Sequence, residues 1–173
     1  MTDNIADLIK IFMRMFPQGV TIATTGKGDL LWGLTISSFT SISLEPPLVM
    51  ISIDKRSRAH DVFLNSNNFA VNILSCEQED IAKAFAGGVP AEERFTLYPY
   101  RIGPSGAPIL VDAPAYLDCV LWKTYVAGDH SILLGKVVDG EVKKMFFPLI
   151  YYNRGYTTVA KHLQETVYPL DFW

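Results

Sequence analysis

Hydrophobic positions near the start of the chain recur at the spacing of an α-helix. The apolar residues that share one helical face are Ile5, Leu8, Ile9 and Phe12. Charged residues occupy the positions between them, so this segment is predicted to be an amphipathic helix and not a secretory signal peptide. After Pro17 the pattern changes to short β-rich segments separated by turn residues.

Strands are predicted wherever apolar and β-branched residues run between Gly, Pro, Asn and Asp. A hairpin is expected over 20–36, with its turn at 26–29, and a strongly apolar strand over 48–53. Further strands are predicted at 69–74, 116–126, 131–138 and 141–146. The predicted turns between and after them are Gly128-Asp129, Asp139-Gly140 and Asn153-Arg154-Gly155, the last within an aromatic segment at 150–159.

Two further helices are predicted. The first covers 58–66 and ends before Asn67-Asn68. Ser75 followed three residues later by Gln78 has the form of a capping box, which predicts a second helix that ends at Gly87-Gly88. Residues 87–114 are rich in Gly and Pro, and so long a segment without regular structure is more often a binding loop than an inert connection. We therefore expect this segment to form one wall of a ligand site.

Short strands, hairpin-length turns and few helices predict a mainly β fold, an antiparallel split β-barrel with peripheral helices. The 173 residues are expected to form a single domain, 1–173. Hydrophobic residues make up 49% of the chain and charged residues 19%, which is typical of a chain that folds. The aromatic tail at 168–173 is expected to pack against another surface, such as a second subunit.

Charge, hydropathy and cysteine content exclude several functional classes. The net charge is −3 and the basic residues are scattered, so no nucleic-acid partner is expected. No stretch approaches the roughly 18 apolar residues of a membrane span, so no membrane association is expected either. Cys76 and Cys119 lack CxxC spacing, which favours a reducing compartment, the cytoplasm. His60, His130 and His162 lie in separate segments without metal-ligand spacing, so no bound metal is expected.

A hydroxyl-rich segment, residues 35–43, lies between two predicted strands. Its hydroxyls and backbone N–H groups are of the kind that bind a polar planar ligand or a phosphate. The alternative is a strand edge whose Ser and Thr side chains only pair across strands. The pattern leaves both interpretations open.

Two other clusters carry candidate chemistry. The run DKRS at 54–57 follows a buried strand and precedes a helix, where Lys and backbone N–H groups bind anions, although charged residues at a strand end are often only solvated. His130 is a titratable side chain in a turn, and such a residue often has no special role. Together with Arg94 and residues 151–154, it would line a pocket for an aromatic cofactor that carries phosphate.

Several motifs occur in the order found in one known family. They are GLTISSFTSISLEPPLVMISIDKRS, FAVNILSCEQEDIAKAF, ERF, GDHSILLGKV and PLIYYNRGY. Over residues 12–157 the chain resembles the flavin reductase family, the small reductase components of two-component flavin monooxygenases. The resemblance implies a split-barrel flavoprotein, usually a homodimer, that takes hydride from NADH or NADPH and passes it to FMN or FAD for use by a partner monooxygenase.

The resemblance also implies site residues. It assigns the flavin ring contacts to Thr35, Ser37 and Ser38. It assigns the phosphate side to Ser52, Asp54, Lys55 and Ser57, with Arg94 as a further flavin contact. His130 matches the catalytic residue that faces the nicotinamide, and Tyr152 and Arg154 match the segment that closes over the nicotinamide nucleotide.

Three positions depart from the family pattern and leave the preferred flavin and the electron acceptor open. Ala59 stands where relatives commonly carry Thr, Gln18 replaces a small hydroxyl residue, and Trp32 is bulky before Gly33. Two alternatives to a monooxygenase reductase remain. One is a reductase that retains its flavin and reduces a corrinoid or a ferric complex, and the other is a non-enzymatic flavin- or haem-binding split-barrel protein.

Overall fold

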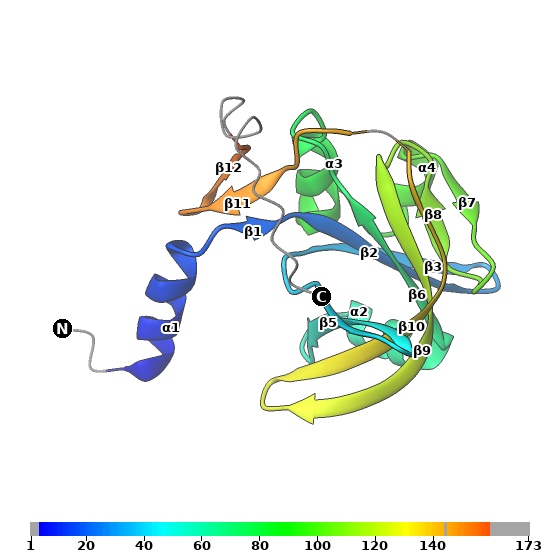
Figure 1. Ribbon diagram of the computed structural model, residues 1–173, viewed down its shortest axis with the longest axis horizontal. Helices are drawn as coiled ribbons and strands as arrows, with labels where there is room; N and C mark the ends of the chain where they lie inside the picture. The colour runs from blue at the N-terminus through cyan, green and yellow to red at the C-terminus, as the bar shows by residue number, and fades with distance from the viewer. Residues whose placement is uncertain (1–3, 144, 160–173) are drawn as a thin grey trace.

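The structure, a computed structural model, describes residues 4–143 and 145–159. The predicted packing of the tail at 168–173 and the position of His162 lie outside the described residues. A seven-stranded antiparallel sheet, in the order β3-β2-β6-β9-β10-β5-β4, forms the body of the molecule (Figure 1). The sheet is strongly curved but not closed, because β3 and β4 are its two edges. The prediction of a mainly β, antiparallel split barrel is confirmed.

The large sheet contains strands of very different length. They are β2 (Thr21–Lys27), β3 (Leu30–Ile36), β4 (Thr40–Leu44), β5 (Pro47–Asp54), β6 (Asn68–Ile73), β9 (Ala115–Ala127) and β10 (His130–Val142). Two small sheets flank it. They are formed by β1 (Gln18–Gly19), β11 (Ile150–Tyr152) and β12 (Gly155–Thr157), and by β7 (Tyr100–Ile102) and β8 (Pro108–Leu110).

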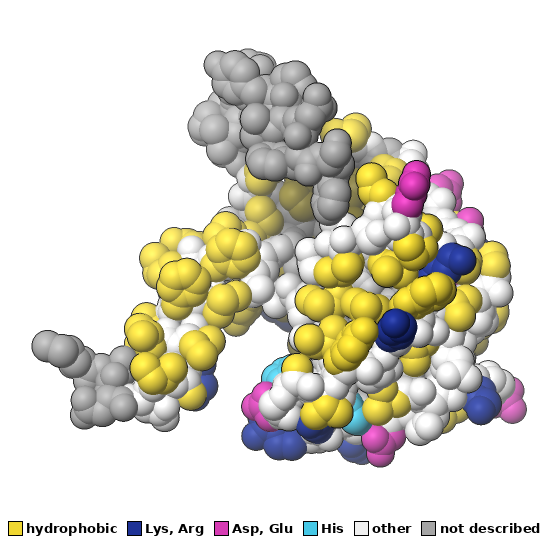
Figure 2. All heavy atoms as spheres, turned by 60° about the horizontal axis from the view of Figure 1, so that its bottom comes forward, with side chains coloured by type: hydrophobic (Ala, Val, Ile, Leu, Met, Phe, Trp, Pro, Cys, Tyr) yellow, Lys and Arg dark blue, Asp and Glu magenta, His cyan; other side chains and the backbone are white. Residues whose placement is uncertain are grey.

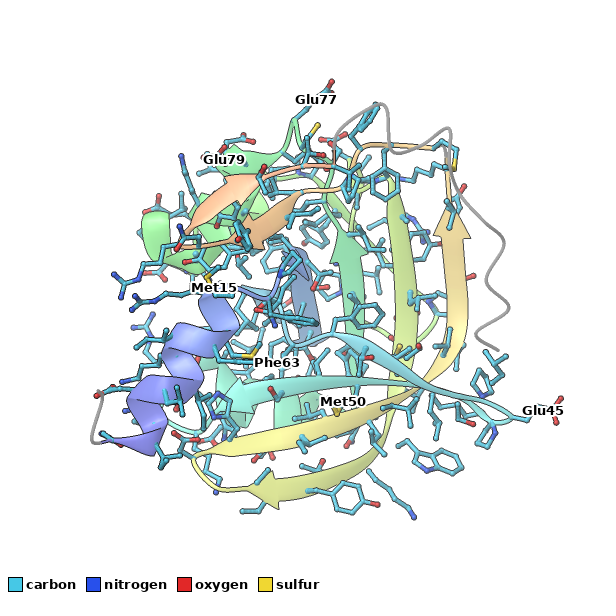
Figure 3. All side chains as sticks on the ribbon, turned by 60° about the vertical axis from the view of Figure 1, so that its left-hand side comes forward. Met15, Glu45, Met50, Phe63, Glu77 and Glu79 are labelled. Carbon is cyan, nitrogen blue, oxygen red and sulfur yellow. The ribbon has the colours of Figure 1, made fainter. Side chains whose placement is uncertain are left out.

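The helices are short and peripheral. They are α1 (Ile5–Arg14), α2 (Ala59–Ser66), α3 (Glu79–Lys83), a π-helical turn η1 (Ala84–Gly88) and α4 (Arg94–Leu97). Helix α2 ends at Asn67, whose φ of 59° is left-handed and stops the helix. Phe63 of α2 and Phe69 of β6 are fully buried in the main core, which α2 closes on one side (Figure 3). Phe85 of η1 anchors a second core.

Helix α1 stands clear of the body, and none of its residues is buried (Figures 1 and 2). The side chain of Asn4 caps it by accepting a hydrogen bond from the N–H of Ala6 at 3.0 Å. The helix agrees with its prediction, yet its apolar face meets no partner within the described chain: Ile5 is 72% exposed and Phe12 68%.

The predicted turn at Asp139-Gly140 is wrong. Strand β10 continues to Val142, with a register shift against β9 between Val137 and Asp139 that marks a bulge. Gly140 lies in a close approach of the two strands, because a Cβ at this position would lie 2.7 Å from Cδ2 of Leu117 and 3.0 Å from the carbonyl oxygen of Tyr116. A separate strand over 141–146 is therefore wrong as well.

The predicted capping box forms only in part. Oε1 of Gln78 accepts a hydrogen bond from the N–H of Ser75 at 3.0 Å, but α3 begins only at Glu79 and continues as the π-helical turn. Segment 87–114 is also more regular than expected, since it contains α4 and the pair β7–β8. The hairpins at β2–β3 and β11–β12 agree with their predictions, and positive φ at Asn153 and Arg154 makes the second turn.

Candidate functional site

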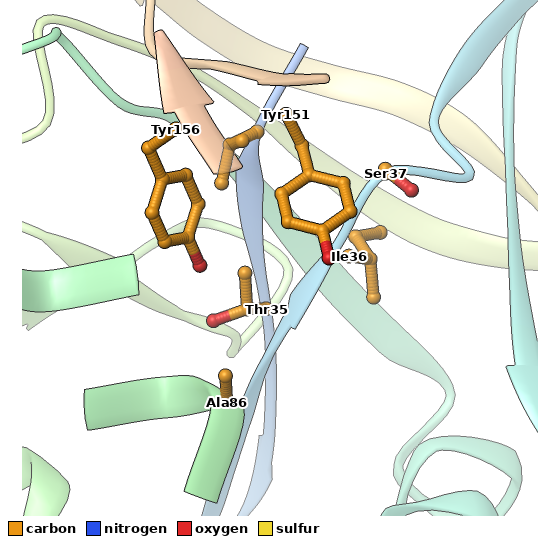
Figure 4. A pocket seen from close by; sticks show the side chains of 7 residues that line it. Thr35, Ile36, Ser37, Ala86, Tyr151 and Tyr156 are labelled. Atoms are coloured by element: carbon orange, nitrogen blue, oxygen red, sulfur yellow. The ribbon is translucent and has the colours of Figure 1, made fainter. Parts of the chain in front are cut away.

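A cavity of about 230 Å³ opens between the end of β3 and the β11–β12 hairpin (Figure 4). Its lining residues are Val20, Thr35, Ile36, Ser37, Ala86, Tyr151 and Tyr156. The rings of Tyr151 and Tyr156 lie 5.6 Å apart at 64° and face the β3 residues across the cavity. Burial raises the pKa of Tyr156, so its phenol stays protonated at neutral pH. The cavity is therefore largely apolar and aromatic, with hydroxyl groups at its edge.

A second cavity of about 300 Å³ adjoins the first and shares Thr35 and Ala86 with it. Its lining residues are Trp32, Leu34, Thr35, Ser57, Arg58, Phe85, Ala86, Gly87, Ala91 and Arg94. The two cavities form a groove along β3, aromatic at one end and basic at the other. The structure thus brings together four of the predicted site residues: Thr35, Ser37, Ser57 and Arg94.

The hydroxyls of the predicted ring site already have protein partners. Thr35 Oγ1 donates to the carbonyl oxygen of Ala82 at 2.6 Å, and Ser37 Oγ donates to Oε1 of Gln18 at 3.1 Å. Ser38 Oγ donates to the carbonyl of Ser52 and accepts from its N–H, both at 3.1 Å. Ser38 therefore ties the β3–β4 connection to β5, which is the cross-strand role that the sequence left open. Ligand atoms would meet the remaining lone pairs of these hydroxyls.

Arg94 is almost fully buried, with 8% of its surface exposed. Its Nη1 donates to the carbonyl of Gly33 at 2.6 Å and its Nε to the carbonyl of Val89 at 3.0 Å. Burial, and next the charge of Arg58, lower its pKa. Gly33 has to lack a side chain here, because a Cβ would lie 2.6 Å from Cε1 of Phe85. The guanidinium is therefore held rigidly at the wall of the second cavity.

Ser57 lies two residues before helix α2. Its Oγ accepts a hydrogen bond from the N–H of Ala59, the first residue of the helix, at 3.2 Å, beside the second cavity. Ala59 itself is 1% exposed and packs in the main core. The methyl side chain of Ala59 therefore packs in the core, whereas the neighbouring Arg58 lines the second cavity.

Asp54, Lys55 and His130 meet at a separate corner, where β5 ends and β10 begins. Asp54 lies opposite His130 in the antiparallel register, and Lys55 Nζ donates to the carbonyl of Gly128 at 2.6 Å. A hydrogen bond from the side chain of Arg56 holds the pKa of Asp54 far below its usual range. These three residues line neither cavity of the β3 groove.

The β11–β12 hairpin contributes Tyr151, which belongs to the predicted pocket segment 151–154, and Tyr156, which the sequence did not single out. Tyr151 lines the first cavity, whereas Tyr152 follows it on the strand and does not. Side chains alternate along a strand, so adjacent tyrosines face opposite sides. Tyr151 lies opposite Tyr156 in the antiparallel register of β11 and β12, and this pairing across the turn brings both tyrosines to the same cavity. Arg154 lies in the exposed turn of this hairpin, so any role for Tyr152 and Arg154 over a nucleotide stays a prediction.

The described chain has no helix long and apolar enough to cross a bilayer. Comparison with known proteins gives a consistent result. A family model described as "Flavin reductase like domain" matches residues 13–160. The reductase component of a flavin-dependent trigonelline monooxygenase from Acinetobacter baylyi is 37% identical over 153 residues, which cover 88% of this chain and 48% of that protein. An NADH-dependent FAD reductase from Streptomyces globisporus is 40% identical over 126 residues, covering 71% of this chain and 69% of that protein.

A solved structure is similar over nearly its whole length. The crystal structure of the flavin reductase HpaC complexed with NADP+ superimposes with a TM-score of 0.84 at 39% identity, covering 90% of this chain and 99% of that one. The chain spans less than half of the first curated relatives, 48% of the trigonelline protein and 40% of a probable flavin reductase from Rhizobium meliloti. The domain match, the identities and the shared fold together show that this chain belongs to the flavin reductase family.

Proposed function

We propose that this protein is an NAD(P)H-dependent flavin reductase. It transfers a hydride from NADH or NADPH to FMN or FAD and supplies reduced flavin to a partner monooxygenase. The observation that carries this proposal is the groove along β3, in which an aromatic cavity adjoins a basic one. Relatives that are named as reductase components of monooxygenases support the choice of partner.

The residues of the groove fit a flavin. The first cavity offers Ile36 and Tyr151 as apolar walls for a flat ring, with Thr35 and Ser37 at its polar edge. In the second cavity no carboxylate accompanies the two arginines, so their charge is available to phosphate. The bound flavin would supply the hydride-accepting chemistry. Thr35, Ser37 and Ser38 are the proposed ring contacts.

The corner formed by β5 and β10 is proposed to hold the remaining ligand groups. Lys55, the residue after the end of β5, offers a positive charge to phosphate close to Ser52 and Asp54 of that strand. His130 is proposed to orient the nicotinamide. Its Nδ1 lies 2.8 Å from Oδ1 of Asp129, and this contact fixes the ring at the start of β10. Because hydride transfer needs positioning and exclusion of water more than an acid or base, His130 is proposed to act as a positioning residue first.

A homodimer is part of the same proposal. Helix α1 exposes an apolar face, and apolar side chains are also exposed on the body of the molecule (Figure 2). Those on the sheet are Ile42, Leu44, Val120, Trp122, Val138 and Val142. Exposed apolar side chains in such numbers are typical of an interface. We assign its occupant as a second copy, which agrees with the homodimers that the resemblance implies.

Anaerobic mixing with NADH or NADPH and each of FMN, FAD and riboflavin tests the proposed activity. We expect the flavin absorbance near 450 nm to bleach only when protein, reduced pyridine nucleotide and flavin are all present. Gel filtration after turnover then separates released from retained flavin. Binding of flavin without any oxidation of NADH or NADPH would contradict the proposal and favour a non-enzymatic flavin protein.

A further inference from the structure

A third cavity continues the groove beyond Trp32. Its volume is about 260 Å³, and it shares Trp32 and Ala91 with the second cavity. Its lining residues are Asp29, Leu30, Leu31, Trp32, Ala91, Glu92 and Phe95. The three cavities thus follow one another along β3, the first near Thr35, the second between Trp32 and Thr35, and the third near Leu30. At the usual rise per residue, β3 spans about 20 Å, which is the length scale of an extended dinucleotide and not of a mononucleotide.

The middle cavity concentrates positive charge. The Arg58 guanidinium lies 5.6 Å from the centroid of the Trp32 ring, and among the described residues it makes neither a hydrogen bond nor an ion pair. Arg94 uses Nε and Nη1 for backbone carbonyls, which leaves Nη2 without a hydrogen bond to a described residue. Two cations with donors to spare, and no carboxylate in the lining, suit two adjacent phosphoryl groups.

The third cavity has a different chemistry. Trp32 and Phe95 present aromatic surface, and Asp29 and Glu92 present carboxylates. A purine stacks on aromatic rings, and its exocyclic amine or the ribose hydroxyls donate to carboxylate oxygens. The order along β3 is therefore a cavity for a flat ring, a basic cavity, and a second cavity for a flat ring with hydrogen-bond acceptors.

We infer that the cavities on both sides of Trp32 bind the adenosine diphosphate half of a dinucleotide, with Trp32 and Arg58 as the residues that determine specificity for it. The inference rests on the proposed function, because that reaction brings a dinucleotide to the groove. FAD, NADH and NADPH all carry this half, whereas FMN does not. Charge alone does not separate FMN from FAD, since both present negative phosphate to Arg58 and Arg94. The third cavity makes the distinction, because only the longer ligand fills it.

Calorimetric titration of the full chain with ADP, and separately with inorganic pyrophosphate, tests the inference without any redox reaction. We expect ADP to bind, and Arg58→Gln to weaken ADP binding at least tenfold. Trp32→Leu should weaken ADP more than pyrophosphate, and Trp32→Phe should restore most of the ADP affinity. Lys136→Gln is the matched control, because Lys136 lies 5.7 Å from the Trp122 ring centroid in a similar pair outside the groove. Circular dichroism confirms that each variant is folded.

Competition then identifies the dinucleotide. If Trp32→Leu weakens FAD binding but leaves FMN binding unchanged, the site holds the flavin dinucleotide. If the same variant raises the KM for NADH and leaves both flavins unaffected, the site holds the pyridine nucleotide. Either result supports the inference. It is overturned if ADP does not bind, or if Arg58→Gln and Lys136→Gln bind ADP equally well. Reduction of FMN by the wild-type protein in that case would leave the proposed reductase function intact.

Discussion

His130 lies directly opposite Asp54 on the neighbouring antiparallel strand, at the point where β10 begins and β5 ends. Lys55, the next residue after Asp54, binds the turn before His130 twice: its N–H donates to the carbonyl of Asp129 at 3.0 Å and its Nζ to that of Gly128 at 2.6 Å. The end of one strand and the start of the other therefore form a single rigid corner. A substitution at the end of β5 is therefore expected to shift the start of β10 as well, and the reverse.

Replacement of His130 by Ala tests its assignment to the nicotinamide. We expect the KM for the reduced pyridine nucleotide to rise about tenfold, because one positioning contact is lost, while the Kd for the flavin changes little. Steady-state kinetics and flavin titration measure the two quantities. An unchanged KM together with an unchanged rate of hydride transfer would remove His130 from the site.

Replacement of Lys55 by Ala tests its role toward phosphate. We expect binding of FMN to weaken by roughly ten-fold or more, as is usual for loss of a charge-assisted hydrogen bond. Riboflavin is the control, since it lacks the phosphate and should bind nearly as well as to the wild type. Fluorescence titration of both flavins gives the comparison. An equal loss for the two flavins would mean that Lys55 acts through the Gly128 turn and not through phosphate.

Gly33 is predicted to be a position where added volume destabilises the fold. In Gly33→Ala the new methyl group meets the Phe85 ring, and we expect the free energy of unfolding to fall by about 1–3 kcal/mol. Binding of ADP should weaken as well, because Gly33 positions Arg94. Gly19→Ala is a matched control, since a Cβ there meets no atom within 4 Å. Urea unfolding of both variants decides the matter, and equal stability would contradict the steric account.

The two cysteines are expected to react very differently. Burial, and next the charge of Asp118, raise the pKa of the Cys119 thiol to about 12, so it stays protonated and inaccessible at pH 8. Cys76 is partly exposed. Titration of the native protein with a thiol-reactive chromophore should therefore show one fast-reacting thiol per chain, and Cys76→Ser should abolish the fast phase. Two fast thiols would show that the core around Cys119 opens readily.

The apolar face of α1 is expected to matter for assembly. Ile9→Glu places a charge on this face, where Ile9 is 58% exposed in the single chain, and should shift a dimer toward monomer. Lys10→Ala is the control, because Lys10 pairs with Asp7 on the polar side of the helix. Analytical ultracentrifugation measures the result. A wild type that is monomeric at micromolar concentration would contradict the proposed homodimer.

Much of the fold was predictable because its signals are local. Helical spacing identified α1, and apolar runs between turn residues identified the hairpin β2–β3 and the strand β5. The prediction of a turn at Asp139-Gly140 was wrong because the feature that requires Gly there is not local. A Gly is required in a turn and also wherever a neighbouring strand comes close, and only the position of Leu117 shows that the second reason applies.

The candidate site likewise has some features that the sequence predicted and others that only the structure shows. The family resemblance, read from the order of motifs along the chain, grouped Thr35, Ser37, Ser57 and Arg94 as ligand contacts, and the structure brings these four residues to the two adjoining cavities. Packing in three dimensions decided that Tyr151 and not Tyr152 faces the cavity, that Ser38 binds β5, and that Arg58 lies over Trp32 beside the buried Arg94. These relationships join segments distant in sequence, and no local pattern encodes which side chains meet when the sheet curves.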